Sequence, residues 1–198
     1  MKLLFSKNKT QLAGFTLIET LVAITILMIS IVGPLTIASK GLIAAVGSRD
    51  QVIASYLAQD AMEYIKNVRD NNLLVDSVNG WTNFLSLMNN NGLCDNSHFC
   101  GIETIPSLNS NPLQMHIVPC NGFSGVPSAA CNLYADSTYS YYTHTAGGNR
   151  PTEFNRTFTV TPESALSDAV LVTVTVNWKN GTIQNQVVLK DMFFNSLR

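Results

Sequence analysis

The sequence predicts an α+β protein, in which one long amino-terminal helix packs on a carboxy-terminal antiparallel β-sheet with disulfide-bonded loops. Residues 15–39 form an apolar stretch whose single ionisable side chain is Glu19, and a helical pattern of apolar residues continues beyond it. Near the other end, residues 169–178 alternate Val with Thr, and an Asn-Gly pair separates them from a second β-rich run. Asn-Gly in this setting is typical of a tight hairpin, because both residues tolerate a positive φ.

The composition allows one modest domain with an appendage in a chain of 198 residues. Hydrophobic residues make up 46% of the chain and charged residues 13%, and the formal net charge is −1. A protein that binds nucleic acid is expected to gather Lys and Arg on one surface. Here the basic residues are scattered apart from a cluster at the amino terminus, so we predict no nucleic-acid partner.

The apolar stretch 15–39 is long enough to cross a membrane. As a helix it would span roughly 37 Å, and a bilayer core is about 30 Å thick. Lys2, Lys7 and Lys9 precede it with no acid among them. The positive-inside rule then places the amino terminus in the cytoplasm and the residues beyond Lys40 outside.

Three interpretations of this segment compete. A secretory signal peptide would have a shorter apolar core and a small-residue cleavage site after it. A plain signal anchor explains everything except Glu19, because a central acid costs on the order of 2.5 to 3.5 kcal/mol on insertion. The third interpretation uses Gly14, Phe15 and Glu19 together.

The stretch KTQLAGFTLIETLVAITIL resembles the class III signal of type IV prepilins and of the pseudopilins of type II secretion, over residues 1 to about 70. The resemblance implies that a prepilin peptidase removes a leader, residues 1–14, by cutting after Gly14, and that Phe15 is then N-methylated. It also implies that Glu19 is an assembly residue, which pairs with the new amino group of a neighbouring subunit. An ion pair offsets much of the cost of burying either charge alone.

The resemblance also implies the partners and the location of the protein. The partners are the prepilin peptidase, other pilin or pseudopilin subunits, an assembly platform in the inner membrane, and membrane lipid before assembly. The expected location is the bacterial inner membrane in a single pass, and a periplasmic or cell-surface filament after assembly.

Gly33 and Pro34 interrupt the pattern of the membrane segment, since Pro34 lacks an amide hydrogen and crowds the carbonyl of Ser30. Such pairs are often kinks in membrane helices. The alternative, similar to pilins with a proline at this place, is that the segment loosens when subunits pack in a fibre.

Residues 40–72 are predicted to form an amphipathic half of the same helix, ending near Asn71 and Asn72. An apolar stripe with mostly helical spacing predicts that a sheet covers it: Val46, Ile53, Leu57, Ala61, Ile65 and Val68.

Residues 73–198 are predicted to form an extracytoplasmic globular domain. We expect a short helix at Trp81–Met88, a short strand at Leu113–Val118, and little regular structure between Asn89 and Asn111 apart from what the cysteines impose. Three or four antiparallel strands are expected in all, including 156–162, 169–178 and 182–194. The final hairpin is similar to minor pilins and pseudopilins of the V/I class. The tyrosine-rich run 137–145 fits either a recognition surface or a strand packed on the sheet.

Four cysteines all lie in the region expected outside the cytoplasm, where an even number favours two disulfides. Three connectivities are open. We favour Cys94–Cys100 and Cys120–Cys131, because each closes a short loop in a stretch with little core. A zinc site with His98 or His116 is the alternative, but paired Cys-x-x-Cys spacings are absent.

No catalytic motif is recognisable in the sequence, and His98, His116 and His144 stand in no clear relation to a nucleophile. We therefore predict no enzyme, no catalytic residues, no cofactor and no metal. The expected function is that of a structural subunit, a minor pilin or pseudopilin of a type IV pilus-like filament. A type II secretion pseudopilin and a membrane-anchored binding or adhesion module that never polymerises remain as alternatives.

Overall fold

A computed structural model describes residues 14–89, 94, 98–105, 111–120, 129–136, 138, 141–162 and 168–195. The chain divides into two compact units, Met1–Val46 and Gly47–Arg198. One helix, α1 (Leu17–Val75), runs through the boundary. Of the predicted leader, residues 1–14, residues 1–13 with their three lysines lie outside the described residues.

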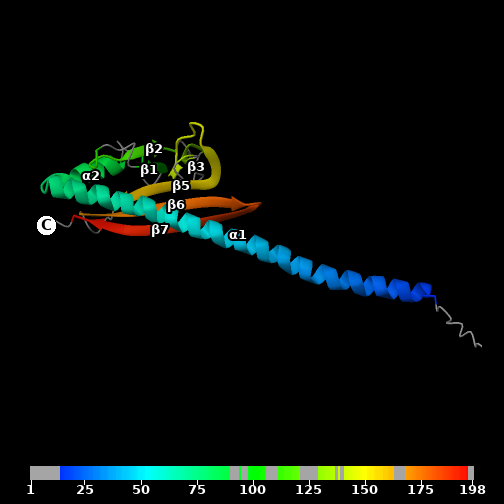
Figure 1. Ribbon diagram of the computed structural model, residues 1–198. Helices are drawn as coiled ribbons and strands as arrows, with labels where there is room; N and C mark the ends of the chain where they lie inside the picture. The colour runs from blue at the N-terminus through cyan, green and yellow to red at the C-terminus, as the bar shows by residue number, and fades with distance from the viewer. Residues whose placement is uncertain are drawn as a thin grey trace, which may run out of the picture. The chain divides into compact units, whose positions relative to one another are not determined.

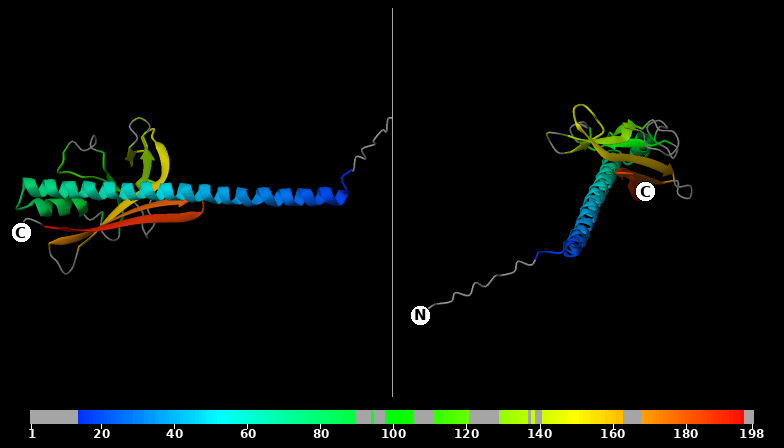
Figure 2. Two further views of the ribbon diagram at one scale, coloured as in Figure 1. Left: turned by 60° about the horizontal axis from the view of Figure 1, so that its bottom comes forward. Right: turned by 90° about the vertical axis from the view of Figure 1, so that its right-hand side faces the viewer.

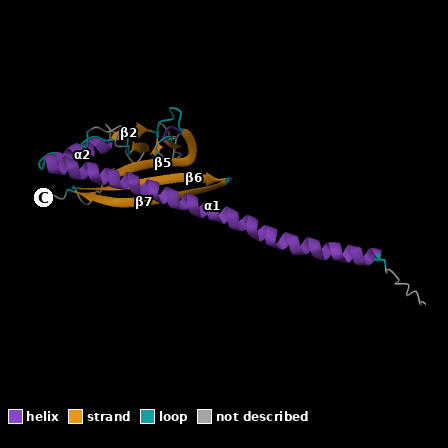
Figure 3. Cartoon of the chain, viewed as in Figure 1, coloured by secondary structure: helices purple, strands orange, loops and turns teal. Residues whose placement is uncertain are grey.

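The second unit is an α+β domain, which confirms the predicted class (Figures 1 and 3). The last part of α1 lies against an antiparallel sheet, and α2 (Gly80–Asn89) lies beside the end of α1 (Figure 2). The strands are β1 (Cys100–Glu103), β2 (His116–Pro119), β3 (Asn132–Ala135), β4 (Tyr142–Thr143), β5 (Arg150–Pro162), β6 (Ala169–Asn180) and β7 (Ile183–Phe194). A short 3-10 turn, Ala129–Cys131, precedes β3.

β5 is the strand on which the sheet is organised. The strand order β2-β1-β5-β3-β4 runs through it. Residues 155–162 of β5 also pair with β6, and the other edge of β6 pairs with β7. All of these pairings are antiparallel. The sheet thus has seven strands in the described residues, so the expectation of three or four was wrong.

The core lies between α1 and the sheet. β6 alternates buried and half-buried residues because one face of it meets the helix, as Val172, Val174 and Val176 show. From α1 and α2 the core receives Ala54, Leu57, Ala58, Ala61, Met62, Ile65, Leu73, Trp81, Phe84 and Met88. Four of the six residues of the predicted stripe are buried, Ile53 is half-buried, and Val46 is exposed.

One short strand, β1, lies in the stretch between Asn89 and Asn111, where little regular structure was expected apart from what the cysteines impose. It begins at the disulfide-bonded Cys100 and is held between β2 and β5. The final hairpin is one residue out of the expected register. Asn180 pairs with Ile183, so the loop consists of Gly181 and Thr182, with the positive φ of 62° at Gly181.

Two other expectations agree with the structure. The predicted helix Trp81–Met88 is α2, and the predicted strand Leu113–Val118 overlaps β2.

α1 continues through Gly33 and Pro34, so this pair does not end the helix. A change of direction of the helix at this pair stays a prediction.

Candidate membrane and assembly segment

The first part of α1 is an apolar helix with no protein partner among the described residues. Every residue from Gly14 to Val46 is exposed, and large side chains such as Leu17 and Ile29 are 82% and 74% exposed. This helix is long and apolar enough to cross a membrane, by length and composition. A helix that is apolar on all sides needs an apolar environment, which lipid or other helices can provide.

Five hydroxyl groups of this segment donate within the helix itself. Thr20 donates to the Leu17 carbonyl over 2.8 Å and Thr25 to the Val22 carbonyl over 2.8 Å. Ser30, Thr36 and Ser39 also donate to carbonyls three or four residues earlier. Because these five hydroxyl groups already have an acceptor in the helix, they do not hinder placement in lipid.

Glu19 lies in the first turn of α1, next to a helix cap. The Glu19 amide donates to the Thr16 carbonyl over 3.1 Å and to the Thr16 hydroxyl over 3.3 Å. Thr16 therefore acts as the N-cap, and Thr-x-x-Glu is the sequence pattern of a capping box. Sequence reasoning missed this contribution, although the spacing was visible. An acid in the first turn is also favoured by the helix dipole.

Gly14 and Phe15 directly precede this cap and are exposed, with 81% of Phe15 accessible. Gly14, Phe15 and Glu19 thus lie within one short segment at the start of the exposed apolar helix.

A network around Arg156 holds α1 to the sheet in the second unit. The Arg156 side chain is fully buried, and its guanidinium donates to Asp60 Oδ2 on α1 over 2.9 Å and to the Ile102 carbonyl on β1 over 2.9 Å. Thr104 also donates to Asp60 Oδ2, over 2.6 Å. Burial lowers the pKa of the Arg156 guanidinium, and the Asp60 carboxylate opposes that effect. Sequence reasoning placed Arg156 in a strand and found no signal for this network.

A buried acid, Glu103, is also hydrogen-bonded within the domain. Glu103 on β1 accepts hydrogen bonds from the Thr143 hydroxyl over 2.7 Å and from the His144 amide over 2.9 Å. Burial, and secondly the Arg156 charge, lower the pKa of His144 to about 3. His144 is therefore a neutral core residue, whereas His116 is exposed on β2.

The disulfides join Cys94 to Cys100 and Cys120 to Cys131, the favoured connectivity, with Cα atoms 5.5 Å apart in both pairs. All four cysteines are buried, and none is free to bind zinc. Within the described part of the chain, no three His, Cys, Asp or Glu side chains are grouped as metal ligands.

Comparisons with known proteins add no relative. No family model matches the chain, no curated protein matches it, and no solved structure matches it.

Proposed function

We propose that this chain is a structural subunit of a type IV pilus-like filament, a minor pilin or pseudopilin, and not an enzyme. In this proposal a prepilin peptidase at the inner membrane cuts after Gly14 and methylates the amine of Phe15. The subunit then leaves the lipid and joins other subunits through its amino-terminal helix.

The exposed apolar helix directly after Gly14 and Phe15 is the observation that carries this proposal. Its surface can be buried either in lipid or against equivalent helices, so membrane and filament are two alternative environments for one surface. The long helix, the antiparallel sheet and the two disulfides are consistent with a pilin-like fold.

Glu19 supports the assembly step. The Thr16 cap leaves the Glu19 carboxylate at the start of the helix, one turn from the new amine of Phe15. In a filament, the carboxylate of one subunit would pair with the amine of the next. A subunit at the wrong height would leave both charges buried and alone, which is costly, so the pair would fix the register of assembly.

Mass spectrometry of the mature amino terminus tests the proposal. The chain is co-expressed with a prepilin peptidase, and we expect N-methylated Phe15 as the first residue. A Gly14→Val variant is the control and is expected to keep Met1. If the unaltered chain also keeps Met1 alongside an active peptidase, the proposal is wrong.

The alternatives are separated by what happens after processing. A type II secretion pseudopilin would form filaments that depend on the secretion machinery. A membrane-anchored binding module would keep its leader and never polymerise.

A further inference from the structure

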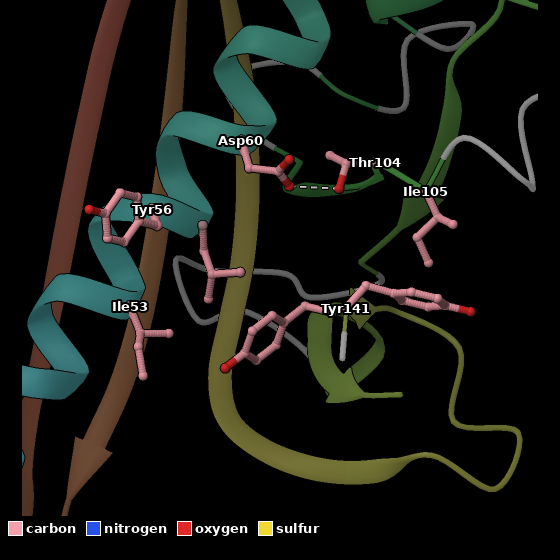
Figure 4. A pocket seen from close by; sticks show the side chains of 8 residues that line it. Ile53, Tyr56, Asp60, Thr104, Ile105 and Tyr141 are labelled. Carbon is pink, nitrogen blue, oxygen red and sulfur yellow. Dashed lines mark hydrogen bonds between the residues drawn. The ribbon is translucent and has the colours of Figure 1, made fainter. Parts of the chain in front are cut away.

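A pocket lies along one flank of α1 in the second unit, away from the amino-terminal segment in sequence. Its volume is about 490 Å³. One wall comes from α1 through Ile53, Tyr56 and Asp60, and the opposite wall comes from Thr104, Ile105 and the tyrosines that lead into β4 (Figure 4). The proposed filament function uses none of these residues.

A second cavity of about 370 Å³ adjoins the first and shares Asp60 and Thr104 with it. Its other lining residues are more polar and include Glu63, Tyr64 and Asn67 on α1. The hydrogen bond from Thr104 to Asp60 therefore lies where the two cavities meet. The two cavities together suit a ligand that repeats along its length, with one unit on each side of this bond.

The Asp60 carboxylate is fixed in place by the core beneath it. Its Oδ2 accepts from the fully buried Arg156 and from Thr104, yet its side chain remains 53% exposed. A carboxylate has more acceptor sites than these two bonds occupy. It can therefore accept hydrogen bonds from a ligand without a change of conformation, which is the arrangement that gives a binding site its specificity.

The charge of Asp60 is largely balanced by Arg156 at 2.9 Å, so the pocket has limited attraction for a second cation. Neutral hydroxyl groups can donate to the carboxylate, because this hydrogen bond does not require an unbalanced negative charge. Anionic ligands are disfavoured, because the Glu63 carboxylate lines the second cavity. The polar wall thus favours an uncharged ligand that carries many hydroxyl groups.

The aromatic wall points to the same class of ligand. Tyr141 and Tyr142 line the pocket beside the apolar side chains of Leu57 and Ile105. Tyr142 is held edge-on against Phe154, with ring centroids 6.3 Å apart. A tyrosine combines an apolar ring face with a polar hydroxyl, which matches a pyranose ring with its apolar C–H face and its equatorial hydroxyls.

We propose that these two cavities form a binding site for a neutral oligosaccharide of two or three rings. One ring packs in the pocket beside Tyr141 and Tyr142, Asp60 accepts from its hydroxyl groups, and the next ring lies beside Glu63 and Asn67. The site binds sugars that carry a carboxylate more weakly.

The test uses the full chain in amine-oxide micelles, which contain no sugar headgroup. Saturation-transfer NMR and titration calorimetry are carried out with cellotriose, maltotriose, lacto-N-triose and triacetylchitotriose, and with sialyllactose as the anionic probe. We expect at least one neutral trisaccharide to bind, and sialyllactose to bind at least about tenfold more weakly.

Two variants locate the binding. Tyr141→Ala is expected to weaken it about tenfold, the loss of one aromatic contact. Glu63→Gln, in the second cavity, should keep neutral binding and reduce the discrimination against sialyllactose. Tyr134→Ala, on β3 outside both cavities, is the matched control and should bind like the unaltered chain. If Tyr141→Ala does not fold, Tyr141→Phe replaces it, with a smaller loss expected.

The proposal is overturned if no neutral saccharide of the panel binds, if sialyllactose binds as well as the neutral probes, or if Tyr141→Ala and Tyr134→Ala have equal effects. None of these results bears on processing after Gly14, so this proposal and the filament proposal fail independently.

Discussion

Arg156 on β5 donates to Asp60 on α1 over 2.9 Å, although 96 residues separate them in the sequence. The same guanidinium reaches the carbonyls of Leu57 and Ile102, so one side chain joins the helix, β5 and β1. Its side chain has no exposed surface. A charge buried so completely is tolerated because its partners are already positioned, and its loss leaves them without a donor.

Arg156→Ala should lower the free energy of unfolding by about 3 to 5 kcal/mol, as expected when one partner of a buried ion pair is removed. Urea unfolding followed by tryptophan fluorescence measures it. The chain has two tryptophans, Trp81 and Trp178, and both are buried in the second unit, so the signal reports on that unit.

Arg150→Ala is the matched control, because Arg150 is exposed on the same strand, and it should change stability by less than about 0.5 kcal/mol. Arg156→Lys keeps the charge but loses the planar fork, so an intermediate loss is expected. Equal unfolding midpoints for Arg156→Ala and Arg150→Ala would show that the network does not stabilise the fold.

The hairpin of β6 and β7 was predictable because Val and Thr alternate and Asn-Gly follows. The register was not, because an Asn-Gly pair does not by itself decide which two residues form the loop. With its amide nitrogen facing the helix, Asn180 donates to Asp50 Oδ2 over 3.1 Å. This contact helps to explain why Asp50 is only 2% exposed.

The strand β1 could not be predicted because its four residues lie among turn formers, and only tertiary packing makes them a strand. Gly101 in its middle has no side chain, and a Cβ there would lie 2.9 Å from His144 Cε1 and 3.1 Å from Cys131 Sγ. The burial of Arg156 could not be predicted either, because an arginine in an alternating strand normally faces solvent. The long apolar helix was predictable because its signal is local and compositional.

The neutral state of His144 makes stability depend on pH. Its pKa is lowered to about 3 in the folded protein, mainly by burial, against an ordinary value of 6.5. Below pH 6.5 the unfolded chain binds a proton that the folded chain does not, so stability should fall as the pH drops from 6.5 towards 3. The contribution reaches about 1.4 kcal/mol per pH unit.

Unfolding free energies between pH 4 and pH 7 measure this effect. His144→Gln should show a shallower dependence on pH than the unaltered chain, whereas His116→Gln should not, because His116 is exposed. The difference in slope isolates His144 from the carboxylates that also titrate in this range. Identical slopes for the unaltered chain and His144→Gln would contradict the assignment.

The two disulfides close loops of different length, with sequence separations of 6 and 11. In the chain-entropy account, removal of each should cost about 2 to 3 kcal/mol, and the longer loop should cost slightly more. We expect the double variant Cys94→Ala/Cys100→Ala to lower the urea midpoint. The double variant Cys120→Ala/Cys131→Ala should lower it slightly more. An unchanged midpoint after full reduction of the protein would show that neither bond stabilises the second unit.

Glu19 has two possible roles, in the helix cap and in assembly, and two substitutions separate them. Glu19→Gln keeps a side chain that suits the third position of a capping box, but it removes the charge. Glu19→Ala removes both. Because the proposed ion pair with a neighbouring amine requires a charge, we expect both variants to be processed after Gly14 and both to be poorly incorporated into filaments.

The measurement is the amount of each variant in sheared filaments relative to the membrane, by immunoblot, together with mass spectrometry of the amino terminus. Thr16→Ala is the complementary control, since it weakens the cap by about 1 kcal/mol and leaves the carboxylate in place. It should assemble nearly as well as the unaltered chain. Normal incorporation of Glu19→Gln, with a defect in Thr16→Ala, would assign Glu19 to the helix start and remove it from the assembly contact.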